Sequence, residues 1–334
     1  MPEPSKEIAR FADVAMFQAE PIDVQAGPQV HLLWMTPDPL GAIAAACKMY
    51  KGEVVRDLST VTDEERLDYL KQITKTKLKA PFEFVKFHFL IEGVTRAFTH
   101  QLVRQRTAVY AQESLRFAVK EDMPVALPPS LAGSRPFEEI LVDTDLGNFD
   151  MLTDVDKAAF KWHKAMSHMQ VAYEDLVNVY QIPAEDARGI LPHNVLTRVH
   201  YATDLRALLD HAGNRLCTQA QFEWRIVFSR IAQELRDISP RGIVHNLGPN
   251  ACNGSQSAYM ASHLADLFAP VCYQTGKCEF KANFDRHCNI RERVDALGES
   301  QIPSSEWSDS DKHGDLAIRP EEWLLNHGAA RKRM

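Results

Sequence analysis

The segment Glu83-Phe-Val-Lys-Phe-His-Phe-Leu-Ile-Glu92 alternates apolar and polar side chains with a period of two. The apolar positions share one side of the pattern, and they are Val85, Phe87, Phe89 and Ile91. Such alternation is typical of a β-strand with one buried face. Beyond Gly93, residues 94–103 carry polar side chains at helical spacing and lead into Arg104-Gln105-Arg106. A strand, a helix and a basic turn are therefore predicted in succession.

Two long helices are predicted on the C-terminal side of this segment. In residues 155–180, large apolar side chains recur at spacings of three and four, namely Trp162, Met166, Met169, Tyr173, Leu176 and Tyr180. Residues 201–235 are predicted as a second helix, with a polar line formed by Arg206, Asp210, Asn214, Gln221 and Arg225. Residues 124–148 lack clear periodicity and are predicted as a long surface loop or, alternatively, a hinge. These patterns indicate an α+β fold with a central sheet flanked by long helices.

The composition is that of a globular protein. Of the 334 residues, 45% are hydrophobic and 25% are charged, and the net charge of −7 argues against a general nucleic-acid-binding surface. No window approaches the roughly 18 apolar residues of a membrane helix, and the N-terminal residues show no export signal. Six cysteines are too few and too unevenly spaced for a disulfide scaffold in a chain of this length. We therefore expect a cytoplasmic protein with no membrane partner.

A boundary is predicted near residue 240, in a segment rich in Gly, Pro and Asn. It divides a domain of residues 1–240 from a C-terminal extension of residues 241–334. The extension holds four of the six cysteines, which are Cys252, Cys272, Cys278 and Cys288. A tetrahedral zinc site is one interpretation, but without a Cys-x-x-Cys pair we favour buried free thiols and predict no metal. Residues 257–268 are predicted as an amphipathic helix that packs on the core or covers an edge of the active site.

The common phosphate-binding and hydrolase motifs are absent. The chain has no Gly-x-Gly-x-x-Gly, no P-loop, no His-Glu-x-x-His and no Gly-x-Ser-x-Gly. In their place, residues 101–116 gather arginines, glutamines and a hydroxyl, namely Gln101, Arg104, Gln105, Arg106, Gln112, Ser114 and Arg116. Guanidinium groups bind phosphate through two hydrogen bonds and stay charged, so the cluster suits a phosphorylated ligand. On spacing alone, a surface patch of ion pairs is an equal alternative.

Three blocks of sequence resemble the flavin-dependent thymidylate synthases, the ThyX family. The first runs from Ile91 to Arg116 and contains that family's pattern of Arg-His-Arg, seven residues and Ser, with Gln105 in place of His. The second is Pro183-Ala-Glu-Asp-Ala-Arg188-Gly-Ile-Leu-Pro192. The third extends from Asp204 through Arg215 to Arg225. The blocks occur in family order across roughly residues 30 to 240.

The resemblance implies a ThyX-like fold and the reductive methylation of dUMP to dTMP. Methylenetetrahydrofolate would supply the carbon, FAD would carry the hydride, and NADPH would reduce the FAD. By position, the flavin would be bound by Arg104, Gln105, Arg106, Asp204, Arg206 and Asp210. The nucleotide would be bound by Gln101, Gln112, Ser114, Arg116, Arg188 and Arg215. In the family these residues come from different subunits of a homotetramer, so the resemblance also implies active sites shared between subunits.

Two of these residues are expected to act most directly on the substrate. Arg215 would polarise a pyrimidine carbonyl and offset the negative charge that develops there. Ser114 has no evident activating base in the sequence, so we expect it to bind the substrate rather than attack it. Cys217 lies on a different helical face from Arg215, which favours a core thiol over a nucleophile.

The chain also departs from the family pattern. Leu78 and Phe84 occupy positions where the family usually has histidines, and Asp204 and Asp210 replace asparagines. Nearby Lys71, Lys75, Lys77 and Lys79 form a solvated face or, alternatively, compensate for lost flavin contacts. Three further hypotheses stay open: one-carbon transfer to another pyrimidine deoxynucleotide such as dCMP, a non-catalytic nucleotide-binding module, and, as the weakest, a zinc-stabilised nucleic-acid adaptor.

Overall fold

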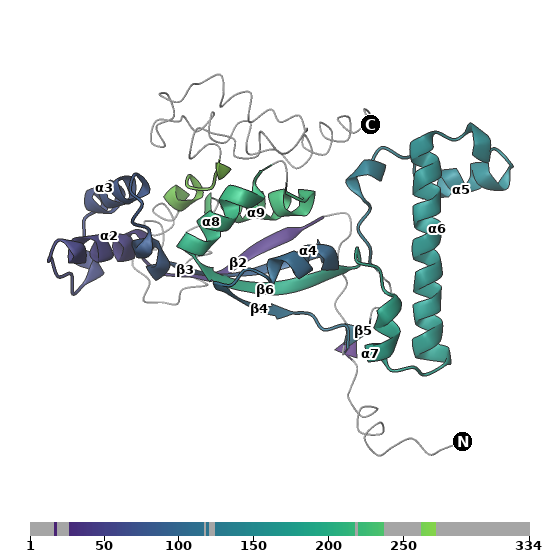
Figure 1. The fold of residues 1–334 in the computed structure, drawn as a ribbon, viewed down its shortest axis with the longest axis horizontal. Coiled ribbons are helices and arrows are strands. Elements are labelled where there is room, and N and C mark those ends of the chain that lie inside the picture. The colour runs from purple at the N-terminus through teal and green to yellow at the C-terminus, as the bar shows by residue number, and fades with distance from the viewer. Residues whose placement is uncertain are drawn as a thin grey trace, which may run out of the picture.

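The computed structural model describes residues 27–116, 124–217, 220–236 and 262–271, together with the backbone of residues 17–18 and 118–119. At its centre is an antiparallel sheet with the strand order β2-β3-β6-β4 (Figure 1). The strands of this sheet are β2 (Gln29–Met35), β3 (Lys86–Thr95), β4 (Ala108–Gln112) and β6 (Leu196–Asp204). A separate parallel pair joins β1 (Phe17–Gln18) to β5 (Ala118–Val119).

The helices of the described residues lie around this sheet. They are α2 (Pro39–Tyr50), α3 (Asp63–Thr74), α4 (Arg96–Leu102), α5 (Phe137–Asp145), α6 (Asp154–Glu174), α7 (Ala184–Ala187), α8 (Leu205–Arg215) and α9 (Phe222–Arg236). Several begin at side-chain caps of the expected kind: Thr62 and Glu65 form a capping box on α3, and Thr95 accepts a hydrogen bond from the backbone N–H of Phe98 on α4. The predicted α+β class is confirmed.

Strand β3 follows the predicted alternation, because Phe87, Phe89 and Ile91 are at most 1% exposed. The strand continues past the expected end at Glu92, through an irregularity between Ile91 and Val94, to Thr95. Gly93 makes this possible, since its φ is +66° and a Cβ there would lie 2.7 Å from the Gly27 carbonyl oxygen. The extension of β3 places Thr95 at the start of α4.

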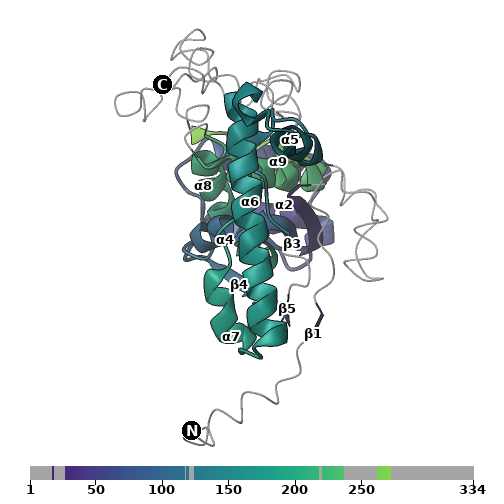
Figure 2. The same cartoon turned by 90° about the vertical axis from the view of Figure 1, so that its right-hand side faces the viewer.

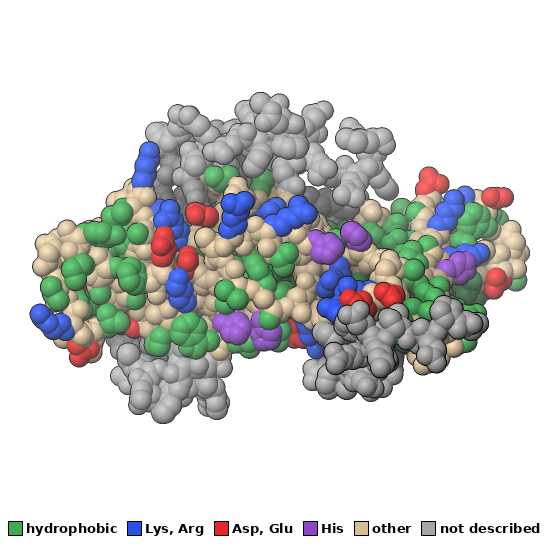
Figure 3. Space-filling model, turned by 60° about the horizontal axis from the view of Figure 1, so that its bottom comes forward, with side chains coloured by type: hydrophobic (Ala, Val, Ile, Leu, Met, Phe, Trp, Pro, Cys, Tyr) green, Lys and Arg blue, Asp and Glu red, His purple; other side chains and the backbone are tan. Residues whose placement is uncertain are grey.

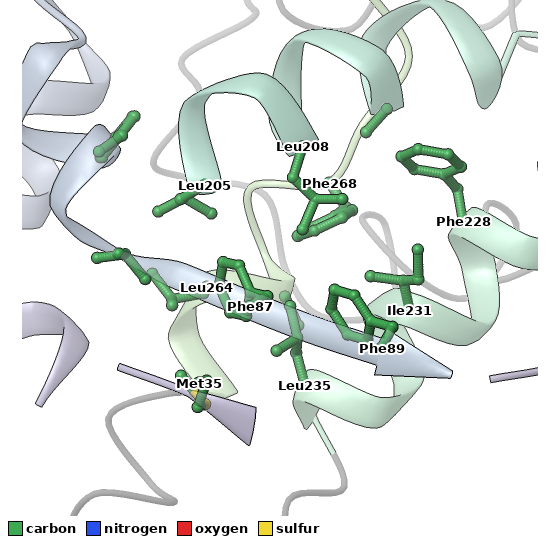
Figure 4. Close-up of a cluster of buried hydrophobic side chains, with 14 of the residues drawn as sticks. Met35, Phe87, Phe89, Leu205, Leu208, Phe228, Ile231, Leu235, Leu264 and Phe268 are labelled. Carbon is green, nitrogen blue, oxygen red and sulfur yellow. The ribbon is translucent and has the colours of Figure 1, made fainter. Parts of the chain in front are cut away.

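The main core lies between the sheet and helices α8 and α9. Figure 4 shows side chains from β3, α8, α9 and residues 262–271 converging there. Leu264 and Ala265 are fully buried in this cluster and Phe268 is 7% exposed. The described part of the predicted helix 257–268 therefore packs on the core, and its first five residues lie outside the described part of the chain. The boundary near 240 and the four C-terminal cysteines also fall outside the described residues.

The prediction of one helix over 201–235 is wrong. Residues 201–204 complete β6, helix α8 ends at Arg215, and α9 begins at Phe222. Asp204 ends the strand and caps α8, since its side chain accepts a hydrogen bond from the Ala207 N–H. The predicted polar line is broken as a result: Arg206, Asp210 and Asn214 are exposed on α8, whereas Arg225 of α9 is 8% exposed.

The prediction of a long surface loop over 124–148 is also wrong in part, because α5 lies within it. Helix α5 packs on α6 through a small cluster that includes Ile140 and Ala159. Helix α6 stands upright beside the sheet (Figures 1 and 2). Its predicted start is confirmed within one residue, and Tyr173 is buried, but Tyr180 beyond its end is 68% exposed.

Candidate active site

The basic turn between α4 and β4 presents two arginines on either side of a buried glutamine. Arg104 and Arg106 are exposed, whereas Gln105 is 8% exposed. The Tyr201 hydroxyl donates to Gln105 Oε1 at 3.4 Å, and the Tyr110 hydroxyl donates to the Gln105 carbonyl oxygen at 3.1 Å. The buried Gln105 Nε2 has no hydrogen-bond partner among the described residues. Because Gln105 is anchored inward, the two guanidinium groups beside it face outward.

This turn lies at the same end of the sheet as the start of α8. Ala108 of β4 pairs with Thr203 of β6, and the Thr203 hydroxyl donates to the Thr107 carbonyl at 3.1 Å. Arg206 therefore lies near the turn, where it forms an ion pair with Glu83 at 2.5 Å. Neither Arg104 nor Arg106 forms an ion pair within the described part of the chain. We call Arg104, Arg106 and Arg206 the turn arginines.

The two aspartates predicted near the flavin have local roles in this structure. Asp204 caps α8 and also pairs with Lys86 at 3.2 Å. Asp210 is exposed, and its backbone carbonyl accepts a hydrogen bond from the Asn214 side chain at 3.3 Å. Asp204 is therefore engaged, while the Asp210 carboxylate lies on the surface of α8.

The segment before β3 presents an apolar surface where the family pattern has histidines. Leu78 is 47% exposed and Phe84 is 63% exposed. The Lys79 side chain reaches back to the end of α3, where its Nζ donates to the carbonyls of Ile73 and Thr74 at 3.1 and 2.9 Å and so caps the helix. Burial lowers the pKa of Lys79. Lys79 therefore stabilises α3, and the charge of Asp210, one of the predicted flavin residues, opposes its pKa shift, so compensation for a lost flavin contact stays a hypothesis.

A second basic group lies at the other end of β4. Arg116 forms an ion pair with Glu185, with Nε 2.9 Å from Oε1, and Nη2 donates to Oε2 at 3.0 Å. Arg188 Nε donates to the backbone carbonyl of the same Glu185 at 3.0 Å. The Ser114 hydroxyl accepts a hydrogen bond from the Arg116 N–H at 3.3 Å. Ser114, Arg116 and Arg188, which the sequence separates by up to 74 positions, are thus brought together.

Arg96 joins this second group and was not among the predicted site residues. Its Nη1 donates to the Glu113 carbonyl at 3.4 Å. Burial and then the charge of Arg188 lower the pKa of Arg96, and Glu113 opposes the shift. The effect of the Arg188 charge on Arg96 indicates that the two guanidinium groups lie near each other. The signal that would have identified Arg96 is its place at the first turn of a helix directly after a buried strand.

Histidines lie close to this basic group. The rings of His100 and His193 are 5.4 Å apart, edge to face. Burial lowers the pKa of His100, and the charges of Arg96, His193 and Arg104 add to the effect. On the sheet face opposite α8 and α9, His88 and His200 approach to 3.0 Å between ring nitrogens. Figure 3 shows histidine side chains on the face that comes forward from below, with basic, acidic and apolar side chains interspersed among them.

Gln101 belongs to a chain of hydrogen bonds between α4 and α9, and Arg215 packs against the indole ring of that chain. The Trp224 Nε1–H donates to Gln101 Oε1 at 3.0 Å, and Arg215 lies over the Trp224 ring at 4.4 Å. Gln101 Nε2 donates to Gln221, whose Nε2 donates to Glu223 at 2.7 Å. Glu223 is 2% exposed and receives both the N–H and the hydroxyl of Thr95. Burial raises the pKa of Glu223, and these hydrogen bonds oppose the shift.

Gln112 and Cys217 complete the set of predicted positions. Gln112 Nε2 donates to the Thr99 hydroxyl at 2.8 Å, which ties β4 to α4. Cys217 is partly exposed rather than buried in the core. In the described residues, no three His, Cys, Asp or Glu side chains form a group that would hold a metal ion. No helix of the described ranges has the length and apolar character needed to cross a membrane.

The sequence was then compared with known proteins. A family model described as thymidylate synthase complementing protein matches residues 31–241. The flavin-dependent thymidylate synthase of Pyrococcus furiosus is 31% identical over 255 residues, which cover 73% of this chain and 93% of that relative. The enzyme of the same description from Clostridium tetani is 26% identical over 246 residues, covering 69% and 90%.

A solved structure supports the fold. The UMP/dUMP methylase PolB from Streptomyces cacaoi, bound with 5-Br dUMP, is similar with a TM-score of 0.50 and 18% identity, covering 65% of this chain and 93% of that one. The family model spans the turn arginines, the second basic group and the chain of hydrogen bonds between α4 and α9. The matched residues and the P. furiosus relative show that this chain is an enzyme of the flavin-dependent thymidylate synthase family.

Proposed function

We propose that this enzyme converts dUMP to dTMP, with methylenetetrahydrofolate as the carbon donor, FAD as the hydride carrier and NADPH as the reductant. The observation that carries the proposal is the exposure of Arg104 and Arg106 without ion-pair partners in the described part of a chain whose net charge is −7. Acidic partners are abundant in such a chain, so two exposed guanidinium groups in one turn that pair with no described acid favour an anionic ligand.

The turn arginines fit the diphosphate of FAD. Arg104 and Arg106 offer forked donors from one turn, and Arg206 approaches from α8, held by Glu83 at 2.5 Å. Gln105 would support this site indirectly, because it anchors the turn between Tyr110 and Tyr201 rather than facing a ligand. The exposed Asp210 would lie at the edge of the same site. FAD, when bound, would supply the hydride that the methyl transfer requires.

The second basic group suits the nucleotide phosphate. Arg116 and Arg188 carry positive charge beside Ser114, and Arg96 adds a third guanidinium nearby. Among the described contacts, the Ser114 hydroxyl meets only the Arg116 N–H and no base. We therefore assign Ser114 to binding rather than to attack. Gln112, held by Thr99 at 2.8 Å, is assigned to the sugar.

Arg215 is assigned to the pyrimidine. It is the last residue of α8, it stacks on Trp224, and it remains partly exposed. A guanidinium in this position would donate to a uracil carbonyl and stabilise the negative charge that develops on the oxygen when the ring is attacked. Gln101 accepts a hydrogen bond from the N–H of the same indole and would donate to the substrate from the other side.

We further infer that the active sites are shared within a homotetramer. The turn arginines and the Ser114–Arg116 segment lie at opposite ends of β4, whose five residues alone span roughly 16 Å. Large apolar side chains that are 66–85% exposed in one chain suit an interface, and they include Val109, Met151, Val179 and Tyr180. Association would bring the turn arginines of one subunit toward the nucleotide group of another.

One observation favours a second candidate, a nucleotide-binding module without flavin chemistry. Leu78 and Phe84 expose apolar surface where histidines are expected beside the flavin and folate. A product assay separates the two candidates. The purified chain is incubated with FAD, NADPH, methylenetetrahydrofolate and either dUMP or dCMP, and methylated nucleotide is detected by mass spectrometry. We expect dTMP from dUMP only when FAD is present; methylation of dCMP instead would reassign the substrate, and no product from either would favour the binding module.

A further inference from the structure

We propose that Trp224 is a specificity-determining residue that makes the site select uracil over cytosine by fixing Gln101 and Arg215 as hydrogen-bond donors. The inference rests on the proposed function, because it concerns how the same site reads its nucleotide. Trp224 itself is fully buried, so its role is one of positioning.

Trp224 holds two predicted nucleotide residues that come from different helices. Arg215 ends α8, and its guanidinium carbon lies 4.4 Å from the centre of the indole ring. Gln101 belongs to α4, and its Oε1 accepts from the indole N–H at 3.0 Å. The ring is clamped in the core by Phe98, at 4.6 Å between centroids, and by Phe228, at 5.8 Å. A rigid indole therefore sets the distance and the orientation between the two polar groups.

The identity of the donors and acceptors gives this chain of hydrogen bonds a single direction from donor to acceptor. An indole N–H donates only, so the Gln101 side chain must turn its oxygen toward Trp224 and its nitrogen toward Gln221. Gln221 must then turn its own nitrogen toward Glu223. At the far end, Glu223 accepts from the Thr95 N–H at 2.8 Å and from the Thr95 hydroxyl at 2.6 Å. The Trp224 N–H, which can only donate, and the Glu223 carboxylate, which accepts, lie at the two ends of these hydrogen bonds. Together they fix the orientations of the Gln101 and Gln221 amides between them.

This direction decides which pyrimidine edge fits. With its oxygen bound to Trp224 and one N–H bound to Gln221, Gln101 retains one N–H for a ligand, and Arg215 offers only donors. Uracil presents two carbonyl acceptors, whereas cytosine replaces one of them with an amino group. Donors that face an amino group leave it without a partner, and sites built in this way reject the mismatched ligand strongly.

The test measures binding of dUMP and of dCMP to the FAD-loaded oligomer for wild type and Trp224→Phe. A phenylalanine keeps an aromatic face for Arg215 but removes the indole N–H, so the Gln101 amide is released to rotate. We expect the ratio of the two dissociation constants, dCMP over dUMP, to fall about tenfold, the value of one hydrogen bond of ordinary net strength. The control is Leu235→Val, which reduces a buried core side chain of the same helix about three turns away from Trp224.

A second variant keeps the indole and changes the acceptor, Glu223, at the other end of the hydrogen-bond chain. Glu223→Gln brings an amide nitrogen against donors, so the amides of Gln221 and Gln101 lose their fixed direction, and the ratio should fall as in Trp224→Phe. This variant carries the test if Trp224→Phe fails to fold. Equal losses of affinity for both nucleotides, or a ratio that matches the Leu235→Val control, would overturn the inference. A wild type that binds neither nucleotide would instead contradict the proposed function.

Discussion

Arg116 and Glu185 meet through two contacts, at 2.9 Å between Nε and Oε1 and at 3.0 Å between Nη2 and Oε2. Both side chains are partly exposed, and the backbone carbonyl of Glu185 also receives Arg188. The Glu185 carboxylate thus occupies the position on Arg116 that a phosphate oxygen pair would take. Substrate binding would replace the Glu185 carboxylate on Arg116 with the substrate phosphate, which would also contact the guanidinium through two oxygens.

Glu185→Gln is expected to tighten binding of dUMP by up to about fivefold, because an exposed ion pair contributes at most about 1 kcal/mol to the state that the phosphate must displace. Isothermal titration in low and high salt would measure it, and the gain should shrink as salt screens the charges. Weaker binding by the variant would show that Glu185 holds Arg116 in its binding geometry instead.

Arg116→Ala and Arg188→Ala should each weaken dUMP binding while leaving the fold unchanged. Each removes a charge-assisted contact of about 1.5–3 kcal/mol, which corresponds to roughly 10- to 150-fold in the dissociation constant. Arg56→Ala serves as the control, because Arg56 is exposed and lies outside both basic groups. If all three variants bind dUMP like wild type, the phosphate site lies elsewhere.

Phe268→Ala should destabilise the whole protein, although residue 268 lies beyond the predicted domain boundary. The side chain is 7% exposed within the main core, and the loss of a buried phenylalanine costs about 3–5 kcal/mol. Urea unfolding followed by circular dichroism gives the free energy of unfolding. Lys161→Ala, at an exposed position of α6, should stay within about 0.5 kcal/mol of wild type. Equal stability of both variants would contradict the packing of residues 262–271.

His211 predicts a pH dependence of stability. Burial, followed by the charge of Arg215, lowers the pKa of His211 to about 4 from an ordinary 6.5. Between these two values the unfolded chain binds a proton that the folded chain does not, so the free energy of unfolding should decrease as the pH falls from about 6.5 to about 4. Thermal unfolding across this window, compared with His211→Gln, isolates the contribution. The variant should lose less stability on acidification, and parallel curves would refute the assignment.

Part of the fold is predictable because its signals are local. The alternation around Phe87 and Phe89 identifies β3, and the spacing of large apolar residues locates α6. The prediction of one helix over 201–235 was wrong because the buried positions of β6 are followed directly in sequence by the apolar face of α8. Asp204, an acceptor at the strand end, is the capping signal that would have separated them.

The site depends more on pairing between distant residues. Sequence similarity identified the arginines, but the inward orientation of Gln105 requires Tyr201, which lies 96 positions away on another strand. The role of Trp224 was missed for the same reason: its neighbours Gln101 and Arg215 come from two other helices. Such contacts follow from the register of β4 and β6 and from the packing of α9, which no local pattern in the chain specifies.

The most direct test of the account is a spectral titration of the purified protein. FAD is added to the wild type, to Arg104→Gln with Arg106→Gln, and to the control Arg56→Gln, and dUMP is then titrated into each. We predict that the wild type and the control bind FAD and that dUMP perturbs the flavin absorption band, whereas the double variant binds FAD at least tenfold more weakly. A wild type that binds dUMP but no FAD under any condition would contradict the assignment of the turn arginines to the flavin.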